Sequence, residues 1–109
     1  VSPYYRDAIS YPAQIVANTD NYDPGVFGWL RLSTDASRNI TGFTGGLQGR
    51  QLTVTNVGAQ NIVLVEQATS TAANQIITGT GSDITVLPLD NVVLKYDSTS
   101  TRWRVVSHY

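Results

Sequence analysis

The sequence predicts an all-β domain, a sandwich or jelly-roll-like fold of about eight or nine short antiparallel strands. Apolar and polar residues alternate in many short segments, which places one row of side chains in a core and the next outside. Clusters of Gly, Pro, Asn and Asp separate these segments. Lys95 is the only lysine and Glu66 the only glutamate, so residue types that favour helices are scarce.

The N-terminal segments are extended but irregular. Residues 1–7 show no clear period and are predicted to form an arm or linker before a single domain at residues 8–109. Ala8–Val16 contains Pro12, which restricts it to an edge or bulged strand. Asn18–Gly25 is a dense cluster of turn residues.

The next strands follow in short succession. Gly28–Ser33 alternates, with Trp29 on the outward side, and Thr34–Arg38 is predicted to be a short turn, with one helical turn as an option. Asn39–Phe43 and Gln51–Val57 are the following strands.

The middle of the chain continues the pattern. Asn56–Asn61 is predicted to be a hairpin-like turn into the apolar strand Ile62–Val65. A second helical turn is an option at Thr71–Ala73, and strands are expected at Gln75–Thr78 and Ile84–Leu87.

The closing hairpin has the clearest pattern. Asn91–Asp97 and Arg102–Val106 alternate on either side of the Ser98–Thr101 turn, and Trp103 points away from both neighbouring arginines. The expected core consists of Leu30, Leu32, Ile40, Leu52, Val54, Ile62, Leu64, Ile84, Val86, Val92, Leu94, Trp103 and Val105.

Composition excludes several classes of partner. The chain has 109 residues, a formal net charge of −1, 14% charged residues and no cysteine. Such a surface has little field to attract nucleic acid or an anionic membrane, and no apolar run is long enough for membrane insertion. Because low charge gives weak protection against association, we expect other subunits to cover part of the surface.

The residues usually needed for catalysis are missing or badly placed. His108 is the only histidine and lies next to the C-terminus, where a solvent- or partner-facing role is expected. Gly79-Thr-Gly81 lacks the lysine and the strand–loop–helix context of a phosphate loop. We therefore expect no enzymatic activity and no cofactor.

A cluster of oxygen-bearing side chains raises the question of a metal. Asp20 and Asp23 lie near Asn18 and Asn21, but their spacing does not match a calcium loop. Turn chemistry is the favoured interpretation, and a weak cation site at Asp20/Asp23 is the alternative.

Arginines and aromatic residues are the best candidates for contacts. Six of the seven basic residues are arginine, which suits either partly buried ion pairs or ordinary surface pairs. The available acidic partners are Asp7, Asp20, Asp35, Asp90 and Asp97. Aromatic residues in irregular segments commonly anchor partners, and stacking on sugars is the alternative. The predicted contact residues are Tyr4, Tyr5, Arg6, Tyr11, Tyr22, Phe27 and Tyr109.

The chain resembles a small β domain that recurs in tailed-bacteriophage virion proteins, including tail fibres, spikes and head-surface proteins. The resemblance runs from about residue 12 to residue 106, as a series of core, turn and arginine positions. These are Pro12-Ala-Gln-Ile15, Asn21-Tyr-Asp-Pro-Gly25, Leu30-Arg-Leu-Ser-Thr-Asp-Ala-Ser-Arg-Asn-Ile-Thr-Gly42, Gly49-Arg-Gln-Leu52, Thr55-Asn-Val-Gly58, Ser70-Thr-Ala-Ala-Asn74, Tyr96-Asp-Ser-Thr99 and Arg102-Trp-Arg-Val105.

The resemblance implies a non-enzymatic structural or adsorption module on the surface of a virion, assembled as a homotrimer. Both a head-surface decoration protein and a module of a tail fibre or spike fit it. The arm at residues 1–7 and the edge strands are expected to make homotypic contacts. The loops Asn18–Phe27 and Ala68–Asn74 are expected to attach to other virion proteins or to a host-surface glycan or protein. A carbohydrate-binding module of a longer fibre or enzyme is the alternative.

Overall fold

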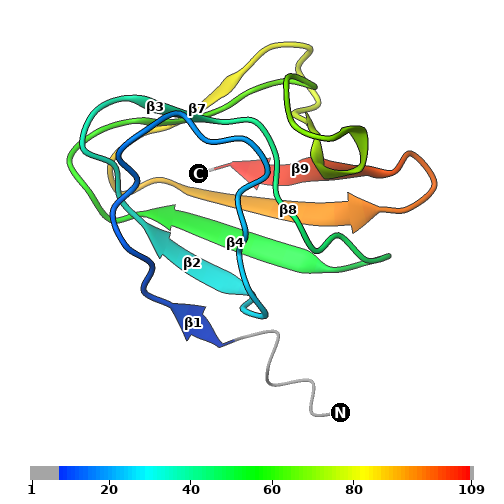
Figure 1. Cartoon of the computed structure of the whole chain (residues 1–109), viewed down its shortest axis with the longest axis horizontal. Coiled ribbons are helices and arrows are strands. Elements are labelled where there is room, and N and C mark those ends of the chain that lie inside the picture. The colour runs from blue at the N-terminus through cyan, green and yellow to red at the C-terminus, as the bar shows by residue number, and fades with distance from the viewer. Residues whose placement is uncertain (1–7, 109) are drawn as a thin grey trace.

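Two β-sheets enclose one core in the computed structural model, which describes residues 8–108 (Figure 1). The six-stranded sheet has the order β1-β2-β4-β8-β9-β6, and the three-stranded sheet has the order β3-β5-β7. The strands are β1 (Ile9–Ser10), β2 (Trp29–Leu32), β3 (Arg38–Ile40), β4 (Gln51–Asn56), β5 (Ile62–Leu64), β6 (Ile76–Ile77), β7 (Ile84–Val86), β8 (Asn91–Asp97) and β9 (Arg102–His108). The expected all-β, sandwich-like fold of about nine short strands is confirmed.

Strand direction differs from the expectation of antiparallel, jelly-roll-like pairing. The pairs β1–β2, β2–β4, β3–β5 and β6–β9 are parallel, whereas β4–β8, β5–β7 and β8–β9 are antiparallel. The physical reason is that the chain crosses to the other sheet between neighbouring strands. Because β3 lies between β2 and β4 in the sequence, the chain returns to the larger sheet in its original direction.

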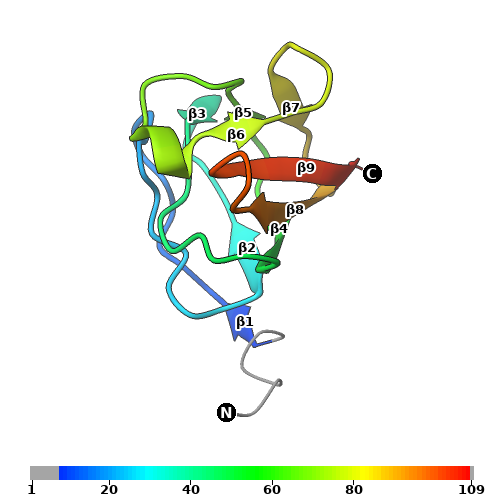
Figure 2. The ribbon, with the colours of Figure 1, turned by 90° about the vertical axis from the view of Figure 1, so that its right-hand side faces the viewer.

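The N-terminal half therefore winds around the core in stacked coils. We define the first coil as residues 9–28 and the second coil as residues 29–52. Parallel pairings join these coils at Ile9 and Trp29, Ile15 and Thr34, Thr19 and Ile40, and Tyr22 and Phe43. The first coil consequently borders both sheets along one side of the sandwich (Figures 1 and 2).

The connections also correct two local predictions. Asn56–Asn61 does not form a hairpin, because β4 and β5 belong to different sheets. Residues 35–37 form bends rather than a helical turn, whereas the optional helical turn at Thr71–Ala73 is present as the 3-10 helix η2 (Ala72–Asn74). No helix within residues 8–108 is long and apolar enough to span a membrane.

The core matches the alternation closely. Every predicted core residue is buried except Val105, which is partly buried and packs against the others. Ile15, Phe43, Ile76 and Tyr96 are also buried, although the prediction did not include them. Three of these four lie in short or irregular segments, where period-two alternation is a weak signal.

Candidate binding face

Among residues 8–108, Tyr11 and Trp29 are the most exposed aromatic residues, and they lie at the outer face of the six-stranded sheet. In β2, Leu30 and Leu32 enter the core, so Trp29 and Arg31 point outward. The parallel register places Arg31 beside Thr55 of β4, and Thr55 lies opposite Asn91 of β8. We call Tyr11, Trp29, Arg31, Thr55 and Asn91 the aromatic face.

A relay of hydrogen bonds holds the Trp29 ring in place. The indole Nε1 of Trp29 donates to Oγ1 of Thr55 at 2.8 Å. The Thr55 hydroxyl in turn donates to Oδ1 of Asn91 at 2.6 Å. Because Trp29 remains 38% exposed, this relay presents a partly open ring whose orientation is already set.

Tyr11 extends the aromatic face beyond the end of β1. Its side chain is 75% exposed, and the guanidinium carbon of Arg31 lies 5.7 Å from the centroid of its ring. A cation over an aromatic ring at this distance is attracted by the quadrupole of the ring. The face therefore combines flat apolar area with a positive charge and with hydroxyl and amide groups.

The predicted contact residues have different environments. Tyr4, Tyr5, Arg6 and Tyr109 lie outside the described residues, so their predicted role stays a prediction. Tyr11 is exposed, as a contact residue must be. Phe27 and Tyr22 are partly buried and pack against the core. The Tyr22 ring packs edge to face against the Phe43 ring, with centroids 6.1 Å apart. Burial is the main cause that raises the pKa of the Tyr22 hydroxyl, and the negative charge of Asp23 adds to it.

Trp29 is the aromatic member of the face that the prediction did not select; Arg31, Thr55 and Asn91 were also absent from the predicted contact residues. Its outward position was visible in the alternation of Gly28–Ser33. The overlooked signal is that a large aromatic residue occupies an outward position next to Arg31.

Asp20 and Asn21, with the side chains and amides that bind them, hold neighbouring loops together; we call this group the Asp20 cluster. Oδ1 of Asp20 accepts hydrogen bonds from the hydroxyls of Thr41 at 2.6 Å and Thr69 at 2.7 Å, and these bonds lower the pKa of its carboxyl group. Oδ1 of Asn21 accepts from the Thr71 amide and from Nδ2 of Asn74, both at 2.9 Å. These four hydrogen bonds join Asp20 and Asn21 to Thr41 and to residues 69–74. The two side chains therefore hold neighbouring loops together.

The side chain of Asp23 stabilises its own turn and does not join the Asp20 cluster. Its Oδ1 accepts a hydrogen bond from the Gly25 amide at 2.8 Å, which is an Asx turn. In the described part of the chain, no three His, Cys, Asp or Glu side chains are grouped so that they could hold a metal ion.

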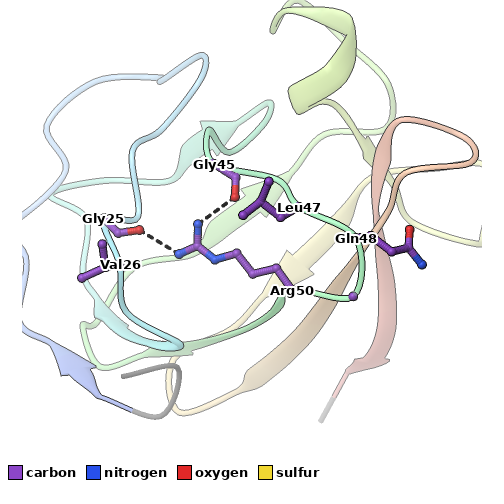
Figure 3. A pocket seen from close by; sticks show the side chains of 7 residues that line it. Gly25, Val26, Gly45, Leu47, Gln48 and Arg50 are labelled. Carbon is purple, nitrogen blue, oxygen red and sulfur yellow. Dashed lines mark hydrogen bonds between the residues drawn. The ribbon is translucent and has the colours of Figure 1, made fainter. Parts of the chain in front are cut away.

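Arg50 links two loops beside an open hollow of about 530 Å³ (Figure 3). Its guanidinium donates to the main-chain oxygens of Gly45 at 2.9 Å, Gly25 at 2.8 Å and Phe27 at 3.0 Å. Burial lowers the pKa of Arg50, although the charge of Asp23 acts in the opposite direction. Exposed Val26 and Leu47 contribute to the lining of the hollow.

Of the expected kinds of ion pair, two arginines form the ordinary surface kind, and two others bind main-chain oxygens instead. Arg38 pairs with Asp35 and Arg104 with Asp97, at 2.8 and 2.9 Å, as partly exposed surface pairs. Arg50 and Arg102 instead donate to main-chain oxygens in turns. The expectation of carboxylate pairing therefore describes two of these residues and not the others.

Comparisons with protein-family models, with curated proteins and with solved structures found no match to this chain.

Proposed function

We propose that this chain is a non-enzymatic structural module on the surface of a tailed-bacteriophage virion and that it acts through assembly and adhesion. The observation that carries the proposal is the aromatic face, an oriented and partly open ring beside a charged and polar row. Such a face suits recognition of a partner by contact area and hydrogen bonds. The Asp20 cluster and Arg50, in contrast, serve the scaffold by joining loops.

The residues that carry the resemblance to virion proteins support this proposal because they form the scaffold. In the closing hairpin, Oδ1 of Asp97 accepts from the Thr99 amide at 3.0 Å and Oδ2 accepts from the Ser100 hydroxyl at 2.9 Å. Trp103, which belongs to the last resembling stretch, is fully buried. A pattern made of core and turn positions is expected of a domain that is reused in different structural proteins.

Immunogold electron microscopy of particles from the source of the chain tests the proposed location. Antibodies against the folded domain should label a fixed position on intact particles. A chain that fractionates away from particles, with no labelled position on them, would contradict a virion role. Sedimentation of the purified chain tests the homotrimer, and removal of residues 1–7 should weaken the trimer while leaving the β-type circular dichroism spectrum unchanged.

Carbohydrate binding is the second candidate, and the aromatic face is the observation that favours it. An aromatic ring flanked by Arg31, Thr55 and Asn91 offers both stacking area and hydrogen-bonding groups to a sugar. The platform is Trp29 with Tyr11 rather than Tyr22, because the Tyr22 ring packs on Phe43.

A glycan array with matched variants separates these functions. If the chain binds a glycan, Trp29→Ala and Tyr11→Ala should each weaken binding at least about tenfold, because each removes stacking area. Val26→Ala, an exposed apolar residue at the hollow near Arg50, should leave binding unchanged. Equal binding by all three variants would exclude the aromatic face as a sugar site.

A further inference from the structure

The first coil leaves one side of its backbone open. Both main-chain groups of Ile15 form hydrogen bonds to the second coil: its amide donates to the carbonyl oxygen of Ser33, and its carbonyl oxygen accepts from the amide of Asp35. Thr19 does the same, with Asn39 and Thr41. In extended backbone the neighbouring residues direct their amides and carbonyls the opposite way. Within residues 8–108, the main-chain groups of Gln14 and Val16 make no hydrogen bond.

This open side carries little of the usual protection of a sheet edge. Natural edge strands are guarded by charges, prolines, bulges or covering segments. Ala8–Thr19 contains no Asp, Glu, Lys or Arg, and Pro12 is its only proline. Tyr11 and Val16 are 75% and 64% exposed there. We call Ala8–Thr19 the open edge; it borders both β2 and β3 (Figure 1).

We infer that the open edge binds a second copy of this chain by main-chain pairing with β7 of that copy. The inference deepens the proposed assembly role and rests on it, because it names the surface through which copies join. β7 is the terminal strand of the three-stranded sheet, so each copy carries both an edge without charged residues and a terminal strand that has a neighbouring strand on one side only.

The geometry of this contact suits a closed ring. The open edge and β7 are different surfaces, so each copy gives β7 to one neighbour and receives β7 from the other. Contacts of this head-to-tail kind close into rings when the rotation between copies permits, as a trimer requires. An uncharged receiving edge adds no like-charge repulsion to the approach of an identical copy.

Charge insertion tests the open edge by sedimentation. Val16→Lys should weaken self-association at least about tenfold, because a lysine on an edge strand must be desolvated on pairing. Val106→Lys is the matched control, since Val106 is 55% exposed on β9 of the same domain. Both variants should retain the β-type circular dichroism spectrum. Loss of association in the Val106→Lys variant alone would overturn the inference, as would a monomeric wild-type chain.

Cysteine crosslinking tests the identity of the partner strand, because the natural chain contains no cysteine. The double variant Val16→Cys/Thr85→Cys should form covalent oligomers on mild oxidation, and Val106→Cys/Thr85→Cys should not. A Val16→Cys/Thr85→Cys variant that oligomerises without intermolecular disulfides would overturn the pairing with β7. The particle-labelling experiment is independent of both results, so failure of this contact and failure of the virion role are distinguishable.

Discussion

Trp103 donates a hydrogen bond from its indole Nε1 to the main-chain oxygen of Phe43, 2.9 Å away and 60 residues earlier in the chain. The same ring meets the rings of Phe43 and Tyr96 edge to face, with centroids 6.0 and 5.3 Å apart. Trp103 thereby joins the closing hairpin β8–β9 to the loop that follows β3. The contact therefore fixes the loop between β3 and β4 to β9 of the six-stranded sheet.

Replacing Trp103 tests this junction. Trp103→Phe should lower the free energy of unfolding by about 2–5 kcal/mol, because it leaves a cavity and deprives a buried carbonyl of its donor. Urea unfolding measures the change. Val106→Ala on the same strand is the control and should change stability by less than about 0.5 kcal/mol, since Val106 is exposed. Equal losses in both variants would contradict the assigned role of Trp103.

Arg50→Lys tests the link between the two loops. A lysine cannot reproduce the planar fork that reaches three carbonyl oxygens, so we expect a loss of about 1–2 kcal/mol. Hydrogen exchange should quicken in residues 23–28 and 44–49. Arg104→Lys, in an exposed pair with Asp97, should cost less than about 1 kcal/mol. If the two lysine variants behave alike, the loops are held by other contacts.

Leu89→Gly should stabilise the chain. Leu89 has a φ of 74° and is 82% exposed, so its side chain contributes little burial while its backbone occupies the left-handed region. That conformation costs a leucine about 1–2 kcal/mol, part of which glycine loses again through its greater entropy when unfolded. We expect a gain of up to about 1 kcal/mol in urea unfolding.

Leu87→Gly is the matched control for that gain. Leu87 lies in the same turn and is half exposed, but its φ is not positive. Glycine should therefore destabilise this position by roughly 0.5–1 kcal/mol. A loss of stability in Leu89→Gly as well would show that the leucine side chain supports the turn.

Stability should fall in acid because several carboxyl groups have lowered pKa values in the folded chain. Hydrogen bonds from the Thr41 hydroxyl and, to a smaller extent, the Thr69 hydroxyl lower the pKa of Asp20. Hydrogen bonds from Arg104 and, to a smaller extent, Ser100 lower the pKa of Asp97. The associated stability is present above the pKa of about 3.9 for an unfolded aspartate. It is lost as pH falls through the lower folded pKa, when the native carboxylates take up protons.

Asp20→Asn provides the check on this pH dependence. The variant cannot take up the proton, so its unfolding free energy should fall less steeply than that of the wild-type chain between about pH 5 and pH 2. Urea unfolding at several pH values measures both slopes. Identical slopes would show that Asp20 contributes nothing to acid sensitivity.

Local alternation predicted side-chain burial well because it depends only on neighbouring residues. Trp103 lies between Arg102 and Arg104, and its burial follows from period-two geometry. Tyr22 shows where this reasoning ends. It belongs to no alternating strand, so nothing nearby in the sequence indicated that its ring would pack on Phe43.

Asn56 explains why the topology was not predictable. Asparagine in a glycine-containing stretch indicated a hairpin turn, yet the side chain of Asn56 is buried. Its Nδ2 donates to the main-chain oxygens of Gln60 at 2.7 Å and Val86 at 2.9 Å, and its Oδ1 accepts from the Gly58 amide. Asn56 thus stabilises the crossing between sheets, through a partner 30 residues away.

Only part of the aromatic face could be predicted from the sequence. An outward Trp29 could be inferred from its strand, whereas its neighbours Thr55 and Asn91 come from strands whose register depends on the whole fold.

Periodicity in the chain was thus sufficient to predict strands and their inward residues, because these properties need only short-range geometry. The low charge of the surface followed from composition alone. Strand direction, the stacked coils, the roles of Arg50 and Asn56 and the assembly of the aromatic face arose on folding. They depend on hydrogen bonds between residues far apart in sequence, and an isolated segment carries no information about which distant partner will satisfy its polar groups.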